Sequence, residues 1–134
     1  MKFTRIYADN TGESHFADIE LPLTLNVPAT GLRATETSPA IATKHVQFLI
    51  APPAAAARDW HPSPARQFAL FLKGGLEVDV SDGSSRRFEQ GSLLFLEDTW
   101  GKGHRTRAVS DEDILWVFIP VLHEFSIRNL TEPA

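Results

Sequence analysis

Hydrophobic residues in the second half of the chain gather in short runs that are separated by turn residues. From residue 67 onward the successive segments read QFALFLKG, LEVDV, RRFEQG, SLLFLED, HRTRAV and ILWVFIPV. Short runs rich in Phe, Val, Leu and Ile, bounded by turn signals, predict the strands of a β-sandwich or barrel. Asp82-Gly83 predicts a hairpin turn, because glycine accepts the positive φ that a tight turn requires.

Two of these runs, residues 93–96 and 114–119, are apolar at every position. A strand of this kind has both faces covered, which suits a closed barrel or a dimer interface better than a sheet with one wet face. No amphipathic helix can be drawn. The alanines at 54–57 follow two prolines and are too few to propagate as a helix, so they are predicted to form a loop.

The first half of the chain has a looser pattern. Residues 2–8 (KFTRIYA) and 44–50 (KHVQFLI) are predicted strands. Residues 21–40 carry three prolines and a glycine and are predicted to form extended segments and loops, with room for one short strand. The chain has no internal repeat, so one domain is expected, with three parts: N-terminal strands and loops (1–43), a barrel (44–122) and a C-terminal tail (123–134).

Composition excludes several classes of function. The chain has 134 residues, of which 43% are hydrophobic and 22% charged, as expected of one globular domain. A net charge of −4 without a basic block predicts no nucleic-acid partner. No run reaches transmembrane length and the N-terminus lacks an apolar leader, so we expect no membrane partner and a cytoplasmic location. The absence of cysteine excludes disulfides, thiolate metal sites and cysteine nucleophiles.

Ionisable and amide side chains collect directly before the buried strand that begins near Phe68. Asp59, His61, Arg66 and Gln67 occupy this position. Polar residues at the entrance of a buried strand are explained if they form the mouth of a binding site. The sequence therefore predicts a binding site at this position.

A second histidine is expected on the inner face of the run at 104–108. Side chains alternate along a strand, and Arg105 and Arg107 must face solvent or a partner, which leaves His104 on the inside. His61 and His104 each start a strand and could converge. Imidazole nitrogens with a nearby carboxylate or amide oxygen are suitable ligands for Fe, Mn, Ni or Zn. The alternative is that both histidines are structural.

From Trp60 to about Pro120 the sequence resembles a small single-domain cupin. The first motif of that family is G-x5-H-x-H, then three or four residues, E, six residues and G. Here Asp59-Trp60-His61 is followed by Gln67 and Gly74. The second motif runs from a glycine through Pro and Gly to a histidine.

In this chain Gly91 and His104 hold the end places of the second motif, which is two residues longer than usual and has Glu97-Asp98 in place of its proline. The resemblance implies an all-β cupin β-barrel of the jelly-roll type, with two antiparallel sheets around a central pocket and an extended N-terminal segment.

The resemblance also implies where a metal and a ligand would bind. Asp59 stands where the family has its first histidine and Gln67 where it has a glutamate, so the expected metal ligands are His61, His104, Gln67 and Asp59. Residues that flank the two motifs are the expected pocket residues: Trp60, Arg66, Glu97, Asp98 and Trp100. For these residues, surface ion pairing, sheet-edge hydrogen bonding and packing are the structural alternatives.

Two functions from different classes fit this pattern. The first is a metal-dependent enzyme of dioxygenase, isomerase or lyase type that acts on a small organic molecule, with a divalent ion as Lewis acid. The second is a non-catalytic cupin that binds a small ligand without metal, as a sensor or storage module.

A homodimer is also predicted. The apolar segments at 2–8 and 114–121 would leave strand edges or an outer face exposed in a monomer, and a symmetric partner would cover both copies at once. Small cupins resemble one another in pairing through their N-terminal strands and one outer sheet face.

Overall fold

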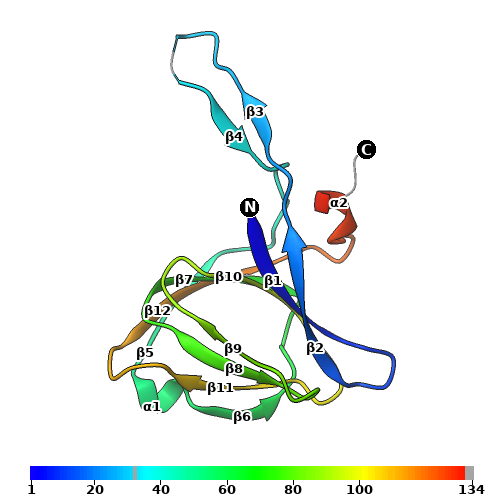
Figure 1. Ribbon diagram of the computed structural model, residues 1–134, viewed down its shortest axis with the longest axis vertical. Coiled ribbons are helices and arrows are strands. Elements are labelled where there is room, and N and C mark those ends of the chain that lie inside the picture. The colour runs from blue at the N-terminus through cyan, green and yellow to red at the C-terminus, as the bar shows by residue number, and fades with distance from the viewer. Residues whose placement is uncertain (32, 132–134) are drawn as a thin grey trace.

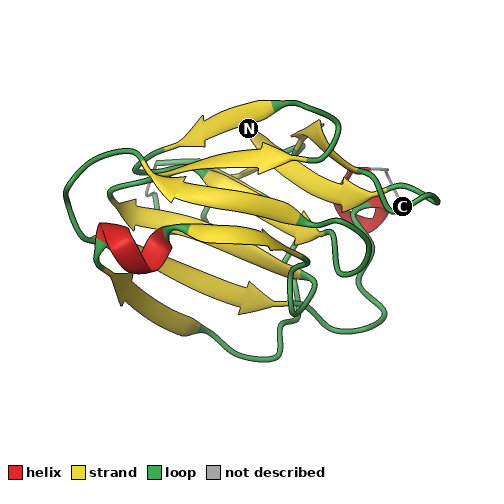
Figure 2. Ribbon diagram, turned by 90° about the horizontal axis from the view of Figure 1, so that it is seen from below, coloured by secondary structure: helices red, strands yellow, loops and turns green. Residues whose placement is uncertain are grey.

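The computed structural model describes residues 1–31 and 33–131, which form two facing β-sheets and a projecting hairpin (Figures 1 and 2). The larger sheet has six strands in this order: β2 (Ser14–Glu20), β1 (Lys2–Ala8), β10 (Leu93–Glu97), β7 (Gln67–Lys73), β12 (Ile114–Pro120) and β5 (Gln47–Ala51). The smaller sheet has four: β6 (Arg58–His61), β11 (His104–Ala108), β8 (Leu76–Val80) and β9 (Ser85–Phe88).

The predicted all-β fold of two sheets is confirmed. All strand pairs in both sheets are antiparallel except β1–β10, which is parallel. Within the described residues no strand of one sheet pairs with a strand of the other, so the barrel is not closed by hydrogen bonds. The hairpin turn predicted at Asp82-Gly83 joins β8 to β9, and Gly83 has the expected positive φ of 96°.

Two hydrophobic cores lie on the two faces of the six-stranded sheet. The first fills the space between the sheets and includes Leu94 and Leu96 of β10. The second covers the outer face and includes Phe95 of the same strand together with residues of the C-terminal segment. Because alternate residues of β10 enter different cores, residues 93–96 of this strand are all apolar, as the sequence predicts.

The N-terminal strand is not an edge of the sheet. β1 lies between β2 and β10, and β12 lies between β7 and β5, so the open edges of this sheet belong to β2 and β5. The open strand edges expected at residues 2–8 and 114–121 are therefore not found, since β1 and β12 are each paired on both sides. Within residues 1–43, β1 and β2 belong to the main sheet.

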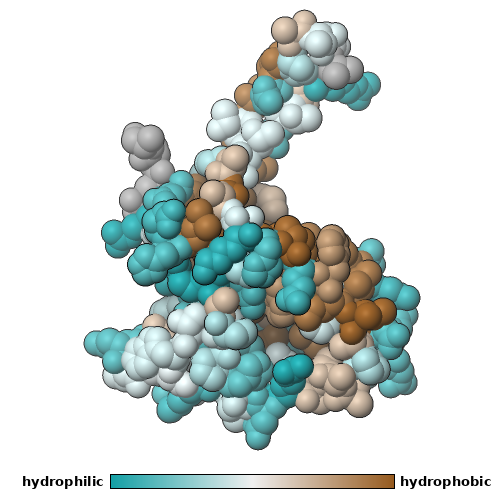
Figure 3. Space-filling model, turned by 180° about the vertical axis from the view of Figure 1, so that it is seen from behind, coloured by the Kyte–Doolittle hydropathy of each residue, from teal (hydrophilic) through white to brown (hydrophobic). Residues whose placement is uncertain are grey.

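A hairpin of β3 (Thr24–Asn26) and β4 (Thr35–Thr37) projects away from the two sheets (Figures 1 and 3). The sequence predicts one short strand here, whereas the structure has two. The alanine run forms one short helical turn, α1 (Pro53–Ala56), whereas the sequence predicts a loop. Pro53 fits the first turn of a helix, because the backbone N–H that proline lacks would have no partner within the helix there. A second turn, α2 (Arg128–Thr131), packs Leu130 into the outer core. No helix among the described residues is long and apolar enough to cross a membrane.

Candidate functional site

A pocket of about 380 Å³ lies between the two sheets. Its walls are mostly aliphatic and aromatic side chains of the inner core, with polar side chains from β6 and β11. The lining residues that bear on function are Arg58, His61, His104, Thr106, Trp116 and Phe118. A concave, largely apolar site with a few polar groups is typical of small-molecule binding.

An irregularity in β6 brings Arg58 and His61 to the same pocket. His104 of β11 pairs with His61, and Thr106 pairs with Arg58, so two steps along β11 correspond to three along β6. This extra residue is a β-bulge, which re-aims side chains relative to a regular strand. Trp60, between them, turns to the outer face, where the guanidinium of Arg105 lies 5.0 Å from its ring.

The two histidines lie side by side, with ring centroids 4.6 Å apart. His61 Nδ1 donates to the carbonyl of Asp59 at 2.7 Å, and His104 Nδ1 donates to Oδ2 of Asp98 at 2.5 Å. A carbonyl and a carboxylate both accept, so each Nδ1 carries a proton. In the neutral ring Nε2 then has a lone pair. In the described part of the chain neither Nε2 has a hydrogen-bond partner, so both can accept from a ligand.

Asp98 orients His104 from a fully buried position. Its side chain is 0% exposed, and Oδ1 has no hydrogen-bond partner among the residues described. The carbonyl of the same residue accepts from the amide of Ser63 at 2.9 Å, which fixes the backbone on which the carboxylate stands. Burying a carboxylate is unfavourable unless it is paired, so the hydrogen bond from His104 stabilises the buried side chain of Asp98.

Gly103 allows the two histidine strands to approach. It has a φ of 72°, a left-handed conformation that glycine adopts without strain. A Cβ at this position would collide with the carbonyl of His61. Glycine at 103 is therefore required for the pairing of His104 with His61.

The structure confirms the predicted alternation along β11. His104 and Thr106 line the pocket, whereas Arg105 and Arg107 both pair with Asp79 on the outer face, at 2.8 and 2.7 Å. Hydrogen bonds and the charge of Arg107, with a smaller contribution from Arg105, hold the pKa of Asp79 well below its usual range. The outer face of the smaller sheet is thus an ion-paired, solvent-facing surface.

Asp59 and Gln67 do not join the histidines in the pocket lining. The carboxylate of Asp59 accepts from the amide of Trp60 at 2.8 Å and lies on an exposed residue. Gln67 is buried at the start of β7, opposite Leu96 and Pro120. Of the four predicted metal ligands, the structure brings only His61 and His104 together.

Arg66 and Glu97 pair with each other outside the pocket. Arg66 donates to Oε2 of Glu97 through two nitrogens, at 2.9 and 3.0 Å, and Arg5 donates to Oε1 at 2.6 Å. Arg66 also donates to the carbonyl of Phe125 at 2.7 Å. Both side chains therefore anchor the C-terminal segment to the large sheet, and Arg66 is not available to clamp a ligand.

Trp100 also lies outside the pocket lining. Its side chain is exposed and lies beside Gly12 in the β1–β2 turn. Of the five predicted pocket residues only Asp98 bears on the pocket, through its hydrogen bond to His104. Arg58, which the sequence prediction missed, lines it directly.

The donor set does not fit a resident divalent ion. Among residues 1–31 and 33–131 no group of three or more His, Asp or Glu side chains lies close enough together to hold a metal ion. His61 and His104 supply two imidazole nitrogens, whereas zinc centres, for example, use three or four protein ligands. The nearest buried carboxylate, that of Asp98, is directed at His104 Nδ1.

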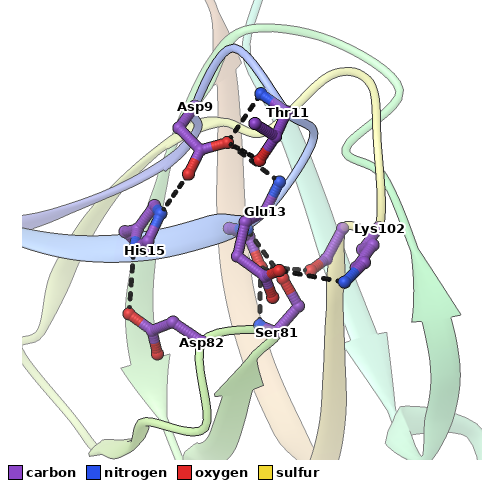
Figure 4. Close-up of polar contacts among 9 residues, drawn as sticks. Asp9, Thr11, Glu13, His15, Ser81, Asp82 and Lys102 are labelled. Atoms are coloured by element: carbon purple, nitrogen blue, oxygen red, sulfur yellow. Dashed lines mark hydrogen bonds and ion pairs between the residues drawn. The ribbon is translucent and has the colours of Figure 1, made fainter.

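A second polar cluster ties the β1–β2 turn and the start of β2 to the turn after β8 (Figure 4). His15 of β2 bridges two carboxylates: Nε2 lies 2.7 Å from Asp9 and Nδ1 lies 2.9 Å from Asp82. Ser14 Oγ donates to the carbonyl of Gly103 at 2.6 Å, which links this cluster to the start of β11. Both ring nitrogens of His15 can donate only when the ring is protonated.

This bridge makes stability dependent on pH. Hydrogen bonds to Asp9 and then Asp82 raise the pKa of His15, and those from Thr11 and His15 lower the pKa of Asp9. The stabilisation by His15 is therefore complete below about pH 6.5 and is lost as pH rises through the raised pKa. The contribution of Asp9 is present above about pH 4 and is lost in stronger acid.

We expect the difference in melting temperature between the wild type and His15→Asn to be largest near about pH 5–6 and to shrink above about pH 8. His45→Asn, at an exposed histidine without a partner among the described residues, is the matched control. A difference for His15→Asn that stays constant from pH 5 to pH 9 would contradict this assignment.

Comparison with known proteins gives a fold relationship only. No family model matches the chain, and no curated protein matches it. Similar solved structures include the cupin domain of Cnp3 from Schizosaccharomyces pombe, with 12% identity over 90% of this chain and 84% of that one, at a TM-score of 0.43. They also include protein NMB1881 from Neisseria meningitidis, with 23% identity over 62% of this chain and 81% of that one, at a TM-score of 0.41.

A cupin domain is among the similar structures. TM-scores of this size carry no argument about activity. The two-sheet fold rests on the strand order and the two cores, and the site rests on the pocket geometry.

Proposed function

We propose that this protein binds a small organic acid with an apolar body in the pocket between its sheets, without a resident metal ion. The observation that carries this proposal is an apolar pocket lined by one arginine and by two histidines whose Nε2 atoms have no hydrogen-bond partner among the described residues. Of the two functions predicted from the sequence, this geometry favours the second, small-ligand binding.

The acid group is inferred from Arg58. It is the one arginine or lysine in the pocket lining, and within the described residues its side chain has no hydrogen bond or ion pair. A guanidinium recognises a carboxylate through two parallel hydrogen bonds. The other arginines that flank the predicted motifs, Arg66 and Arg105, are already paired with carboxylates.

The pocket also limits the size and polarity of the ligand. About 380 Å³ lies near the lower end of the usual range for small-molecule sites. Phe71, Trp116 and Phe118 line it, and such walls suit an aromatic or short aliphatic body. A hydroxyl or amine on that body would donate to His61 or His104.

A second candidate is metal-independent acid–base catalysis on the same ligand. The specific observation in its favour is the hydrogen bond from His104 to buried Asp98, which fixes the tautomer and leaves Nε2 toward the pocket as a base. A histidine oriented in this way can take a proton from a bound acid or hydroxyl group. Formation of a product from a bound compound would favour this candidate over binding alone.

The test is a binding screen with matched acids and amides. We expect aromatic and short aliphatic carboxylates to raise the melting temperature, and the corresponding neutral amides to do so less. Arg58→Met should weaken binding of the acid at least tenfold, about 1.4 kcal/mol, by calorimetry. Arg87→Met, at an exposed arginine of β9 outside the pocket, should bind like the wild type.

Two results would overturn the proposal. One is equal affinity for an acid and its amide in both the wild type and Arg58→Met. The other is stoichiometric binding of Fe, Mn, Ni or Zn that His61→Ala abolishes. Mass spectrometry of the same incubations separates binding from turnover.

A further inference from the structure

The projecting hairpin lacks a core of its own. All six strand residues of β3 and β4 are exposed, and Leu25 and Val27 are 63% and 70% exposed. An isolated two-stranded hairpin is marginally stable in water. We call residues 22–43, which contain this hairpin, the arm. Leu23 and Ile41 at its base pack against the outer core of the same chain, whereas Leu25 and Val27 are left exposed by the described residues.

A complementary apolar surface lies on the outer face of the six-stranded sheet. Phe48 and Ile50 of the edge strand β5 are 71% and 69% exposed, and Val46 just before it is also exposed. We call Val46, Phe48 and Ile50 the β5 face. In Figure 3 hydrophobic residues gather on the body of the molecule below the arm. Exposed apolar patches of this kind mark interaction sites.

An apolar groove continues the β5 face toward the base of the arm. It has a volume of about 550 Å³ and includes Val46, together with Leu70, Leu93 and Ile119 of the sheet. Leu23, at the base of the arm, lines its other side. The groove and the β5 face therefore form one continuous apolar surface beside the arm.

The exposed area of the chain matches the needs of a dimer. A compact monomer of 14.9 kDa exposes about 7,000 Å², whereas this chain exposes 8153 Å². The excess is about 1,100 Å², and a standard protein–protein interface buries about 800 Å² on each partner. A second copy can cover this excess, because each copy carries both the arm and the β5 face.

We propose that the protein forms a symmetric homodimer in which the arm of each copy packs on the β5 face and groove of the other. A twofold axis repeats the contact between the arm of one copy and the β5 face of the other, so the arms of both copies are covered. This arrangement differs from the pairing of N-terminal strands predicted from the sequence, because β1 is paired on both sides within its own sheet. It does not depend on what the pocket binds.

The experiment uses two charge variants of the full chain, one on each surface. Val27→Glu alters the arm and Phe48→Lys alters the β5 face. By sedimentation equilibrium we expect the wild type to have twice the 14.9 kDa chain mass, and each variant alone to dissociate at least tenfold more readily. Trp100→Glu, at a similarly exposed aromatic in a distant loop, should remain a dimer.

Mixing the two variants tests the exchange itself. In a mixed dimer one contact pairs the introduced glutamate on the arm with the introduced lysine on the β5 face, and the other contact is wild type. The mixture should therefore recover dimers that neither variant forms alone. Circular dichroism of each variant confirms that it is folded. A wild-type monomer at high micromolar concentration, or a mixture that stays monomeric, would overturn the proposal.

Discussion

Replacing Phe95 by alanine is expected to lower the free energy of unfolding by about 3–5 kcal/mol, the usual loss for a fully buried phenylalanine. Phe95 is 0% exposed, and its ring centroid lies 4.6 Å from that of Phe68 and 5.4 Å from that of Phe125. Arg66 also lies over the ring, 5.9 Å from its centroid. The substitution would leave a cavity between the large sheet and the C-terminal segment.

Urea denaturation at one fixed protein concentration measures this loss, since the proposed dimer would make stability dependent on concentration. Phe95→Leu keeps most of the volume and is expected to lose less than about 1.5 kcal/mol. A loss below about 1 kcal/mol for the alanine variant would mean that the C-terminal segment does not pack on this face.

The strands of the second half could be predicted because their side chains alternate between defined environments. The run at 93–96 is apolar throughout, since Leu94 and Leu96 enter the inner core and Phe95 the outer one. Arg105 and Arg107 reveal the outward face of β11, and His104 follows as inward. In each case a local pattern determines which face a residue occupies.

The bulge in β6 explains why one site residue was missed. In a regular strand Arg58 would share a face with Trp60, and no turn residue in the sequence reveals the extra position. The actual register places the exposed Arg58 and the partly buried His61 together in the pocket lining and turns Trp60 to the outer face. A tertiary pairing with β11 determines this, so strand periodicity alone assigns the wrong face to Arg58.

Neighbouring carboxylates were equally hard to separate. Glu97 and Asp98 are adjacent, and the sequence assigns the pair to the pocket without a distinction. The structure directs Glu97 outward to Arg5 and Arg66, and buries Asp98 beside His104. The distinction depends on Arg5 of β1, a strand that pairs in parallel with β10 from the far end of the sequence.

Asp98 and His104 depend on each other for their burial. Asp98 is 0% exposed, and its only side-chain hydrogen bond within residues 1–31 and 33–131 is the one from His104. Removal of one member of a buried pair leaves the other uncompensated, whereas removal of both leaves only a packing defect. The energies of the two single substitutions should therefore not add.

His104→Phe is expected to lower the free energy of unfolding by about 3–5 kcal/mol, because it leaves the carboxylate of Asp98 buried without a partner. The double variant, with Asp98→Ala added, should lose less than the single variant, since the buried charge is then absent. Urea denaturation of the wild type, both single variants and the double variant forms a double-mutant cycle. His61→Phe is the control. The His61 ring is hydrogen-bonded to the backbone carbonyl of Asp59, an exposed residue, so this variant should remain stable without a second substitution. If Asp98→Ala makes His104→Phe less stable still, the carboxylate is not held by His104.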